Sequence, residues 1–209
     1  DKGQRVVLVP AVGSGAIFQP VDYTLYSDFT HPECYGLNEQ LISLGVSRAV
    51  NWRGVQHEPG LPMPMKLLGR RAVSQLEDEI EEIRRRVPGI EIEQPRGKPN
   101  TARAIVAVAS VVRAHPSKAA EYRDRLFRAY WRNSTDLSEP AELQRVADDA
   151  GVPRVVELDH PDAAELVENW DLDWATERLG GVPRAIRGDG KILWGLRPRE
   201  EVAAFFGVA

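Results

Sequence analysis

Cysteine is almost missing from this sequence, because Cys34 is the only one among 209 residues. A single thiol excludes a disulfide within the chain and any metal site built from several cysteines. It fits a reducing compartment, so we expect a cytoplasmic location. Long apolar runs are missing too: no stretch approaches the ~20 residues needed to cross a bilayer, and no membrane association is expected.

The sequence also lacks an excess of charge of one sign. Its 27 Lys and Arg residues nearly balance its 31 Asp and Glu residues, which leaves a net charge of -4. No block of basic residues is long enough to predict nucleic acid as a partner. The basic residues 84–86 end an acidic helical pattern, where cations complement the helix dipole, so we interpret them as a solvated face.

The sequence does contain the composition of an ordinary globular domain, with 43% hydrophobic and 28% charged residues. Residues 21–29 alternate as a strand does, and residues 48–55 predict a second strand. Between them, Thr30 is expected to cap a helix that has Pro32 in its first turn and ends at Gly45. The three prolines of HEPGLPMPM predict a loop.

A block of helical patterns follows. An apolar stripe at steps of three and four predicts a long helix over residues 68–87, ended by Pro88 and Gly89. Further helices are predicted over residues 102–114, 118–132, 140–150, 161–179 and 199–206. Capping of the 140–150 helix is assigned to Ser138, and capping of the 102–114 helix to Asn100 and Thr101. The segments RAIR and KILWG flank a GDG turn and predict a β-hairpin. The aromatic residues expected in the core include Trp52, Tyr122, Phe127, Trp131 and Trp194.

Five segments, taken in order, resemble one family. They are SDFTHPECYG, KPNTARAIVA, LFRAYWRNSTDLSEPAEL, GGVPRAI and ILWGLRPREEVAAFF. The resemblance spans residues 21–207 and is to the DsbA-like family, which includes disulfide oxidoreductases, 2-hydroxychromene-2-carboxylate isomerases and kappa-class glutathione transferases. It implies an α/β protein, a thioredoxin fold with an inserted all-helical cap domain. The implied division is an N-terminal extension at 1–20, thioredoxin-like parts at 21–60 and 152–209, and the inserted helical domain at 61–151.

In this resemblance the segment HPEC stands where the family carries C-P-x-C. His31 takes the place of the first, nucleophilic cysteine, Pro32 matches the proline, and Cys34 takes the place of the second cysteine. Disulfide exchange needs a second thiol to resolve the mixed disulfide, which this chain cannot supply by itself. We therefore expect an oxidoreductase-like protein that acts as a thiol-dependent isomerase or transferase rather than a dithiol exchanger.

The isomerase and kappa-class branches imply how such a site works, because a non-cysteine residue there holds the thiolate of bound glutathione. By analogy His31 is the candidate catalytic residue, as hydrogen-bond partner or base, and Cys34 is the second candidate. No bound cofactor is expected beyond glutathione or another small thiol. The substrate-binding candidates that the resemblance adds are Thr30, Pro32, Val182 and the cis-proline Pro183.

The charge state of His31 depends on opposing effects. A helix N-terminus disfavours the cationic imidazole, whereas Glu33 next to it favours a protonated His31 and a protonated Cys34 thiol. Structural interpretations stay open for both residues: His31 packing its ring at a helix start, and Cys34 as a small buried apolar residue.

Other functions remain open as well. His57 and Glu58 are candidates to line the same cleft, and with His31 and Cys34 they could form a metal site, although no second closely spaced ligand pair supports structural zinc. A non-catalytic thioredoxin-like binding module, with the Pro-rich loop 59–64 lining an apolar cleft, is the alternative to an enzyme. A homodimer is left open.

Overall fold

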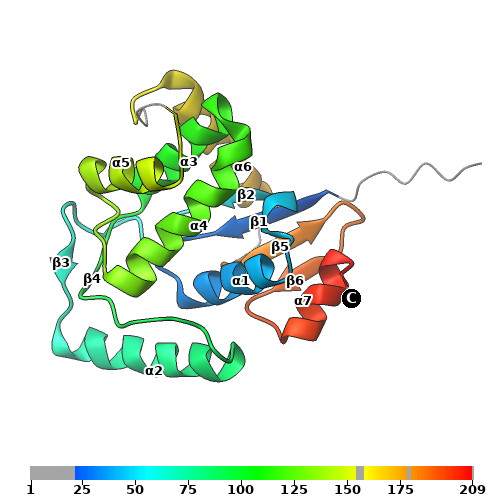
Figure 1. The fold of residues 1–209 in the computed structure, drawn as a ribbon, viewed down its shortest axis with the longest axis horizontal. Helices are drawn as coiled ribbons and strands as arrows, with labels where there is room; N and C mark the ends of the chain where they lie inside the picture. Colours follow the sequence, from blue (N-terminus) through cyan, green and yellow to red (C-terminus); the bar gives the residue numbers. More distant parts are fainter. Residues whose placement is uncertain (1–21, 154–157, 178–179, 209) are drawn as a thin grey trace, which may run out of the picture.

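The computed structural model describes residues 22–153, 158–177 and 180–208 (Figure 1). Its centre is a four-stranded mixed sheet in the order β2-β1-β5-β6. Strand β1 runs parallel to β2 and antiparallel to β5, which is antiparallel to β6. The strands are β1 Tyr23–Ser27, β2 Val50–Gly54, β5 Arg184–Arg187 and β6 Ile192–Trp194. The predicted α/β class and the C-terminal hairpin are confirmed, whereas the N-terminal extension lies outside the described residues.

Helices cover both faces of the sheet. Successive residues of β1 point to opposite faces of the sheet, so Tyr23 and Tyr26 lie on opposite faces, and each contacts an aromatic residue of a different helix. The Tyr23 ring lies 4.8 Å from that of Phe206 in α7 (Arg199–Phe206), and the Tyr26 ring lies 5.1 Å from that of Trp174 in α6 (Pro161–Glu177). Helix α1 (Pro32–Ser43) packs beside α7. The start of α1 is therefore fixed at the end of the central strand.

The remaining helices come between β2 and β5 in the chain, as expected for an inserted helical part. They are α2 Arg70–Arg86, α3 Ala102–Ala114, α4 Pro116–Asn133 and α5 Pro140–Asp149. Figure 1 shows α3, α4, α5 and α6 together above the sheet, whereas α2 lies apart, below α1. Helix α2 buries only a narrow stripe of Leu76, Ile80 and Ile83. The predicted core residues Tyr122, Phe127 and Trp131 of α4 are fully buried.

Two predicted helix caps are wrong for the same reason. Helix α1 begins at Pro32 with His31, not Thr30, as its N-cap, and α5 begins at Pro140 with Glu139, not Ser138, as its N-cap. Both N-caps have extended backbones, with ψ of 121° and 119°. A proline pushes the preceding residue out of the helical region, so the residue just before it becomes the cap.

Several other predictions differ from the structure in detail. Strands β1, β2 and β6 are shorter than predicted, β5 has the predicted bounds, and a 3₁₀ turn (η1, Ser47–Ala49) precedes β2. A two-stranded ladder, β3 (Lys66–Leu67) with β4 (Gly97–Lys98), was not predicted, and the predicted end of α6 at residue 179 lies outside the described residues. Trp52 in β2 is buried as expected, but Trp194 in β6 is 52% exposed, so its predicted place in the core is wrong. Within the described ranges no helix is long and apolar enough to span a bilayer.

Candidate functional site

The turn between β1 and α1 is held by the helical part of the protein. The indole N–H of Trp131 in α4 donates a hydrogen bond of 2.8 Å to the Phe29 carbonyl oxygen. Thr30 is buried, and the His31 N–H contacts the Asp28 carbonyl oxygen at 3.4 Å. These contacts fix the backbone that presents His31 at the N-terminus of α1.

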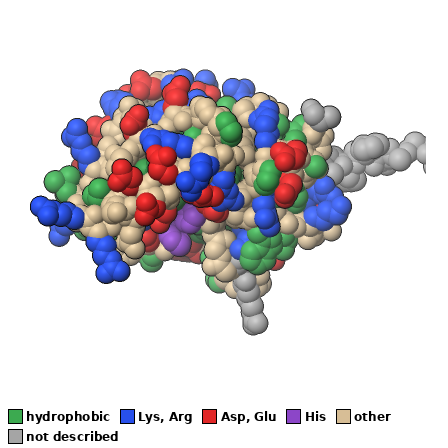
Figure 2. Space-filling model, turned by 90° about the horizontal axis from the view of Figure 1, so that it is seen from below, with side chains coloured by type: hydrophobic (Ala, Val, Ile, Leu, Met, Phe, Trp, Pro, Cys, Tyr) green, Lys and Arg blue, Asp and Glu red, His purple; other side chains and the backbone are tan. Residues whose placement is uncertain are grey.

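His31 lies in a cavity of about 480 Å³ between the start of α1 and the side of α2. The lining residues are Thr30, His31, Pro32, Glu33, His57, Glu58, Asp78, Glu79, Glu82, Ile83 and Lys98. Figure 2 shows histidine side chains at the surface on this face of the molecule, next to acidic side chains. The structure therefore brings together His31, Pro32 and Thr30 with the alternative candidates His57 and Glu58.

Two histidines face each other in this cavity. The rings of His31 and His57 lie with centroids 5.0 Å apart, edge to face. The second histidine is positioned by Asp28, a residue that the sequence did not single out. The Asp28 carboxylate accepts a hydrogen bond of 2.6 Å from the backbone N–H of His57, and the Asp28 side chain is buried. Asp28 thus links the turn that carries His31 to the loop that carries His57.

His31 is a neutral imidazole at physiological pH. Burial of the ring lowers its pKa to about 4, with a further lowering from His57, while Glu33 opposes the shift. Burial, rather than either of the two opposing effects expected from the sequence, is the main cause of the shift. The Nδ1 atom is buried and has no hydrogen-bond partner among the described residues. The ring also makes no capping hydrogen bond to α1, so its Nε2 is the nitrogen that a ligand in the cavity can reach.

Cys34 does not line the cavity. Its side chain is 1% exposed, and its Sγ accepts a hydrogen bond from the Asp28 N–H at 3.5 Å. Burial raises the pKa of the Cys34 thiol well above its usual range. The thiolate is the form of cysteine that attacks disulfides and binds metals, so this thiol is protonated and shielded. The geometry agrees with the structural interpretation of Cys34.

Glu33 and Arg86 hold the mouth of the site together. The carboxylate of Glu33 accepts a hydrogen bond from Arg86 at 2.8 Å and another from the Leu196 N–H at 3.1 Å. Arg86 also donates to the Leu196 carbonyl oxygen. Arg86 is thus not part of a merely solvated face, because it connects the end of α2 to the first turn of α1. Arg84 and Arg85 pair with Glu81 and Glu82 on their own helix.

The Val182–Pro183 peptide bond is cis. Tyr26 pairs with Arg184 in the antiparallel ladder between β1 and β5, so this peptide precedes β5 next to the end of β1. Val182 and Pro183 are both buried, and neither belongs to the lining of the His31 cavity. Their roles in ligand binding stay predictions from the resemblance.

The structure gives no support to a metal site. Among the described residues, no three His, Cys, Asp or Glu side chains are grouped so that they could hold a metal ion. Cys34 faces the Asp28 backbone rather than the cavity that contains His31 and His57. The four candidate ligands named from the sequence are therefore divided between two environments.

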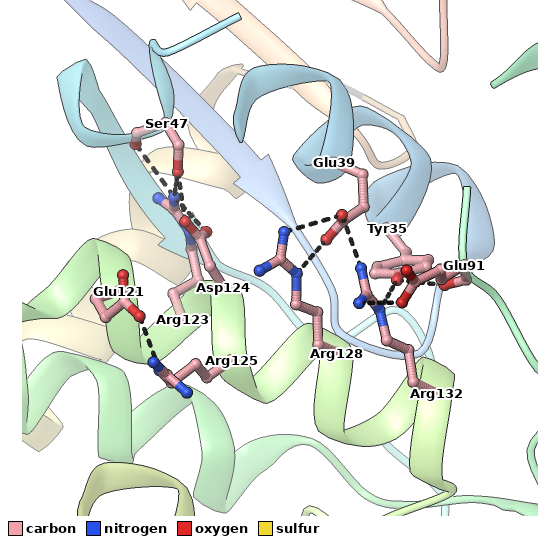
Figure 3. Close-up of polar contacts among 10 residues, drawn as sticks. All are labelled: Tyr35, Glu39, Ser47, Glu91, Glu121, Arg123, Asp124, Arg125, Arg128 and Arg132. Carbon is pink, nitrogen blue, oxygen red and sulfur yellow. Dashed lines mark hydrogen bonds and ion pairs between the residues drawn. The ribbon is translucent and has the colours of Figure 1, made fainter. Parts of the chain in front are cut away.

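On its other side, α1 meets α4 through a paired polar network (Figure 3). The carboxylate of Glu39 accepts hydrogen bonds from Arg128 at 2.8 and 3.1 Å, and from Arg132 at 3.1 Å. Further along α4, Arg123 contacts Asp124 at 2.7 Å, and the carboxylate of Asp124 accepts the Ser47 hydroxyl at 2.7 Å. This network joins the helical part to the sheet part of the molecule.

A sheet of this order, a helix start with Pro at its first position and a cis-proline beside it define a thioredoxin-type protein with a helical insertion. Residues 24–206 match the family of DSBA-like thioredoxin domains. The chain belongs to this family. No curated protein is similar enough in sequence to match it.

Solved structures of the same fold include three with related names. A probable DsbA oxidoreductase from Streptomyces coelicolor has a TM-score of 0.72 at 15% identity, over 89% of this chain and 88% of that one. A 2-hydroxychromene-2-carboxylate isomerase has a TM-score of 0.63 at 20% identity, over 88% and 92%. The cytosolic disulfide reductase DsbM from Pseudomonas aeruginosa, with glutathione, has a TM-score of 0.62 at 14% identity, over 89% and 97%. At these identities the likeness shows the fold.

Proposed function

We propose that this protein is a cytoplasmic, thiol-dependent member of the DsbA-like family, acting as an isomerase or transferase. A small thiol or thiol adduct binds in the cavity next to His31, with glutathione as the reference ligand. The observation that carries the proposal is His31 itself: a neutral imidazole at the start of α1, in the cavity and with no protein partner for its ring among the described residues.

Dithiol exchange is the less suitable activity for this site. The mechanism requires an exposed thiolate and a second thiol to resolve the mixed disulfide. Cys34 is alone in the chain, buried, and protonated because burial raises its pKa. The one thiol that the protein has is therefore unsuited to the first step, and the second step has no thiol within the chain.

His31 supports thiol binding as a hydrogen-bond partner rather than as a full base. A thiol has an ordinary pKa of about 8.5, whereas the pKa of His31 is about 4. Complete proton transfer across this gap of about 4–5 units would cost roughly 6 kcal/mol. A neutral imidazole can instead share a hydrogen bond with the sulfur, and the N-terminal turn of α1 favours a sulfur with anionic character.

Calorimetric titration of glutathione tests the proposal. We expect the wild type to bind glutathione and the His31→Ala variant to bind at least about tenfold more weakly, the loss of one hydrogen bond of about 1.4 kcal/mol. His160→Ala is the matched control, because His160 is exposed and outside the cavity lining. Equal binding by wild type and His31→Ala, or a wild type that binds no small thiol, would contradict the proposal.

A second candidate is a non-catalytic binding module, and one observation favours it. A second cavity, of about 590 Å³, adjoins the first and has apolar walls that include Leu61, Pro62, Leu67 and Leu68. Leu67 is 79% exposed there. An apolar peptide segment suits this surface, and peptide binding without turnover of any thiol conjugate would favour this candidate.

A further inference from the structure

We propose that the His31 cavity selects its thiol ligand by charge, and that the ligand is neutral or cationic rather than anionic. This inference rests on the proposed function and specifies the class of thiol. The cavity is bordered by carboxylates from three segments, with Lys98 as the one basic residue in its lining. The acidic lining residues are Glu33, Glu58, Asp78, Glu79 and Glu82.

Three of these carboxylates are neutralised by neighbouring cations. Glu33 pairs with Arg86 at 2.8 Å, and Glu58 pairs with Lys98 at 3.0 Å. Glu82 pairs with arginines at the end of α2. These pairs also occupy Lys98, so the cation in the lining already has a carboxylate partner and is not held ready for an anionic ligand.

Two carboxylates of the lining stay uncompensated. Asp78 and Glu79 lie one after the other on α2 and have no hydrogen bond or ion pair within the described part of the chain. The His31 ring adds no positive charge at neutral pH, because its pKa is about 4. Apart from the paired groups, the cavity therefore presents two negative charges to whatever binds next to His31.

The acidic wall lines the same cavity as His31, whose ring has no hydrogen-bond partner among the described residues. Glu79 also borders the adjoining cavity, together with the ion pair of Glu58 and Lys98. The uncompensated charge of Glu79 therefore lies where the first cavity meets the second, and it acts on the charge of the part of the ligand that follows the sulfur.

Three forms of one thiol test this inference. Glutathione, its monoethyl ester and its diethyl ester carry the same thiol, with net charges of about -1, 0 and +1 at neutral pH from the ordinary pKa values of their groups. We expect affinity to rise in that order, by about tenfold in total at low ionic strength, and the differences to shrink as salt screens the charges. Calorimetry on the wild type gives the three dissociation constants.

Variants of α2 assign the effect to the cavity wall. In the Asp78→Asn/Glu79→Gln double variant the three affinities should become equal within about threefold. The control is Glu77→Gln/Glu81→Gln, which removes two charges from the same helix outside both cavity linings and should keep the wild-type order. Esterification also removes carboxylate hydrogen-bond acceptors from the ligand. This loss is the same for every protein, so it cancels when the variants are compared with the wild type.

The outcomes separate this inference from the function on which it rests. Thiol binding that depends on His31 but favours glutathione, or that is equal for all three forms, would overturn charge selection and keep the proposed function. An unchanged order in Asp78→Asn/Glu79→Gln would overturn the role of these two residues. Absence of binding for all three forms would overturn both the charge selection and the proposed function.

Discussion

The two polar regions that meet helix α1 are built in opposite ways. Towards α4, Glu39 accepts hydrogen bonds from two arginines, and the buried Arg123 is paired with Asp124 and Ser47 (Figure 3). At its N-terminus, α1 presents His31, whose Nδ1 is buried without a partner among the described residues. The named polar groups of the first region are paired with one another, whereas the His31 ring of the second region has no such partner among the described residues.

This difference separates stability from function. A buried ion pair adds little net stability, because the attraction between its charges is offset by the cost of burying them. Removing one partner is nevertheless costly, because the other charge is left buried and unpaired. A buried polar group without a partner costs stability, and a ligand or a water that pairs with it removes this cost. We therefore expect variants of the α1–α4 network to change the free energy of unfolding, and variants of the His31 region to change binding.

The largest effect is expected for Arg123→Met. Arg123 is 2% exposed, and its loss leaves the carboxylate of Asp124 buried with the Ser47 hydroxyl as a neutral partner. We expect the free energy of unfolding to fall by about 3–5 kcal/mol, as for other buried pairs that lose one member. Urea denaturation followed by circular dichroism measures the change, and the folded variant should bind thiol as the wild type does.

The control for this prediction is an exposed ion pair. The side chain of Arg145 is 51% exposed and pairs with Glu142 and Asp149. Solvent and salt screen such pairs, so Arg145→Met should change the free energy of unfolding by less than about 1 kcal/mol. If the two variants were destabilised equally, burial would not explain the contribution of the Arg123 network to the free energy of unfolding.

The next effect is the pH dependence of stability that His31 causes. Its pKa falls from 6.5 to about 4 on folding, so the unfolded chain binds more protons between these values. Stability from this group is present above pH 6.5 and is lost as the pH falls towards 4. Relative to His31→Gln, the wild type should lose up to about 3 kcal/mol over that interval, measured by urea denaturation at several pH values.

The pKa of Asp28 also shifts on folding, in the opposite direction to the pKa of His31. Burial raises the pKa of the Asp28 carboxyl, so its protonation favours the folded state as the pH falls. Because wild type and His31→Gln share Asp28, its contribution cancels in the difference between them. Parallel stability curves for the two proteins would show that His31 is protonated equally well in the folded and unfolded states.

Much of the fold could be predicted from periodicity. The boundaries of α3 and α7 agree with the predicted ones to the residue, and the stripe of α2 was recognised from its spacing. The N-caps of α1 and α5 were assigned to the wrong residues because the restriction on a residue before proline was given too little weight. The ladder of β3 and β4 was missed because two-residue strands have no period to detect.

The site was predictable only where it is local in sequence. His31 was indicated by the resemblance of the contiguous segment HPEC to the family's C-P-x-C, and His57 was named as an alternative. Asp28, Asp78 and Glu79 were missed, since their places depend on how distant segments pack. A polar residue between a buried strand and the motif was the one local signal for Asp28, whereas the α2 carboxylates resembled any solvated helix face.

The smallest effect is expected for Cys34, which stands at the second cysteine position of the family motif. We expect this position, unlike the first position at His31, to take no part in thiol binding. Cys34→Ala removes one buried sulfur that accepts a single N–H, so we expect a loss of about 1 kcal/mol in the free energy of unfolding. Thiol binding should be unchanged, because Cys34 is outside the cavity lining.

Alkylation with N-ethylmaleimide tests the same prediction by chemistry. A buried, protonated thiol reacts slowly, so mass spectrometry should find the native wild type unmodified and the urea-unfolded protein labelled at one site. Cys34→Ala, unlabelled in both states, confirms the assignment. Rapid labelling of the native protein that also abolishes thiol binding would instead make Cys34 part of the site, and His31 would then be the partner of a protein thiol rather than of a bound one.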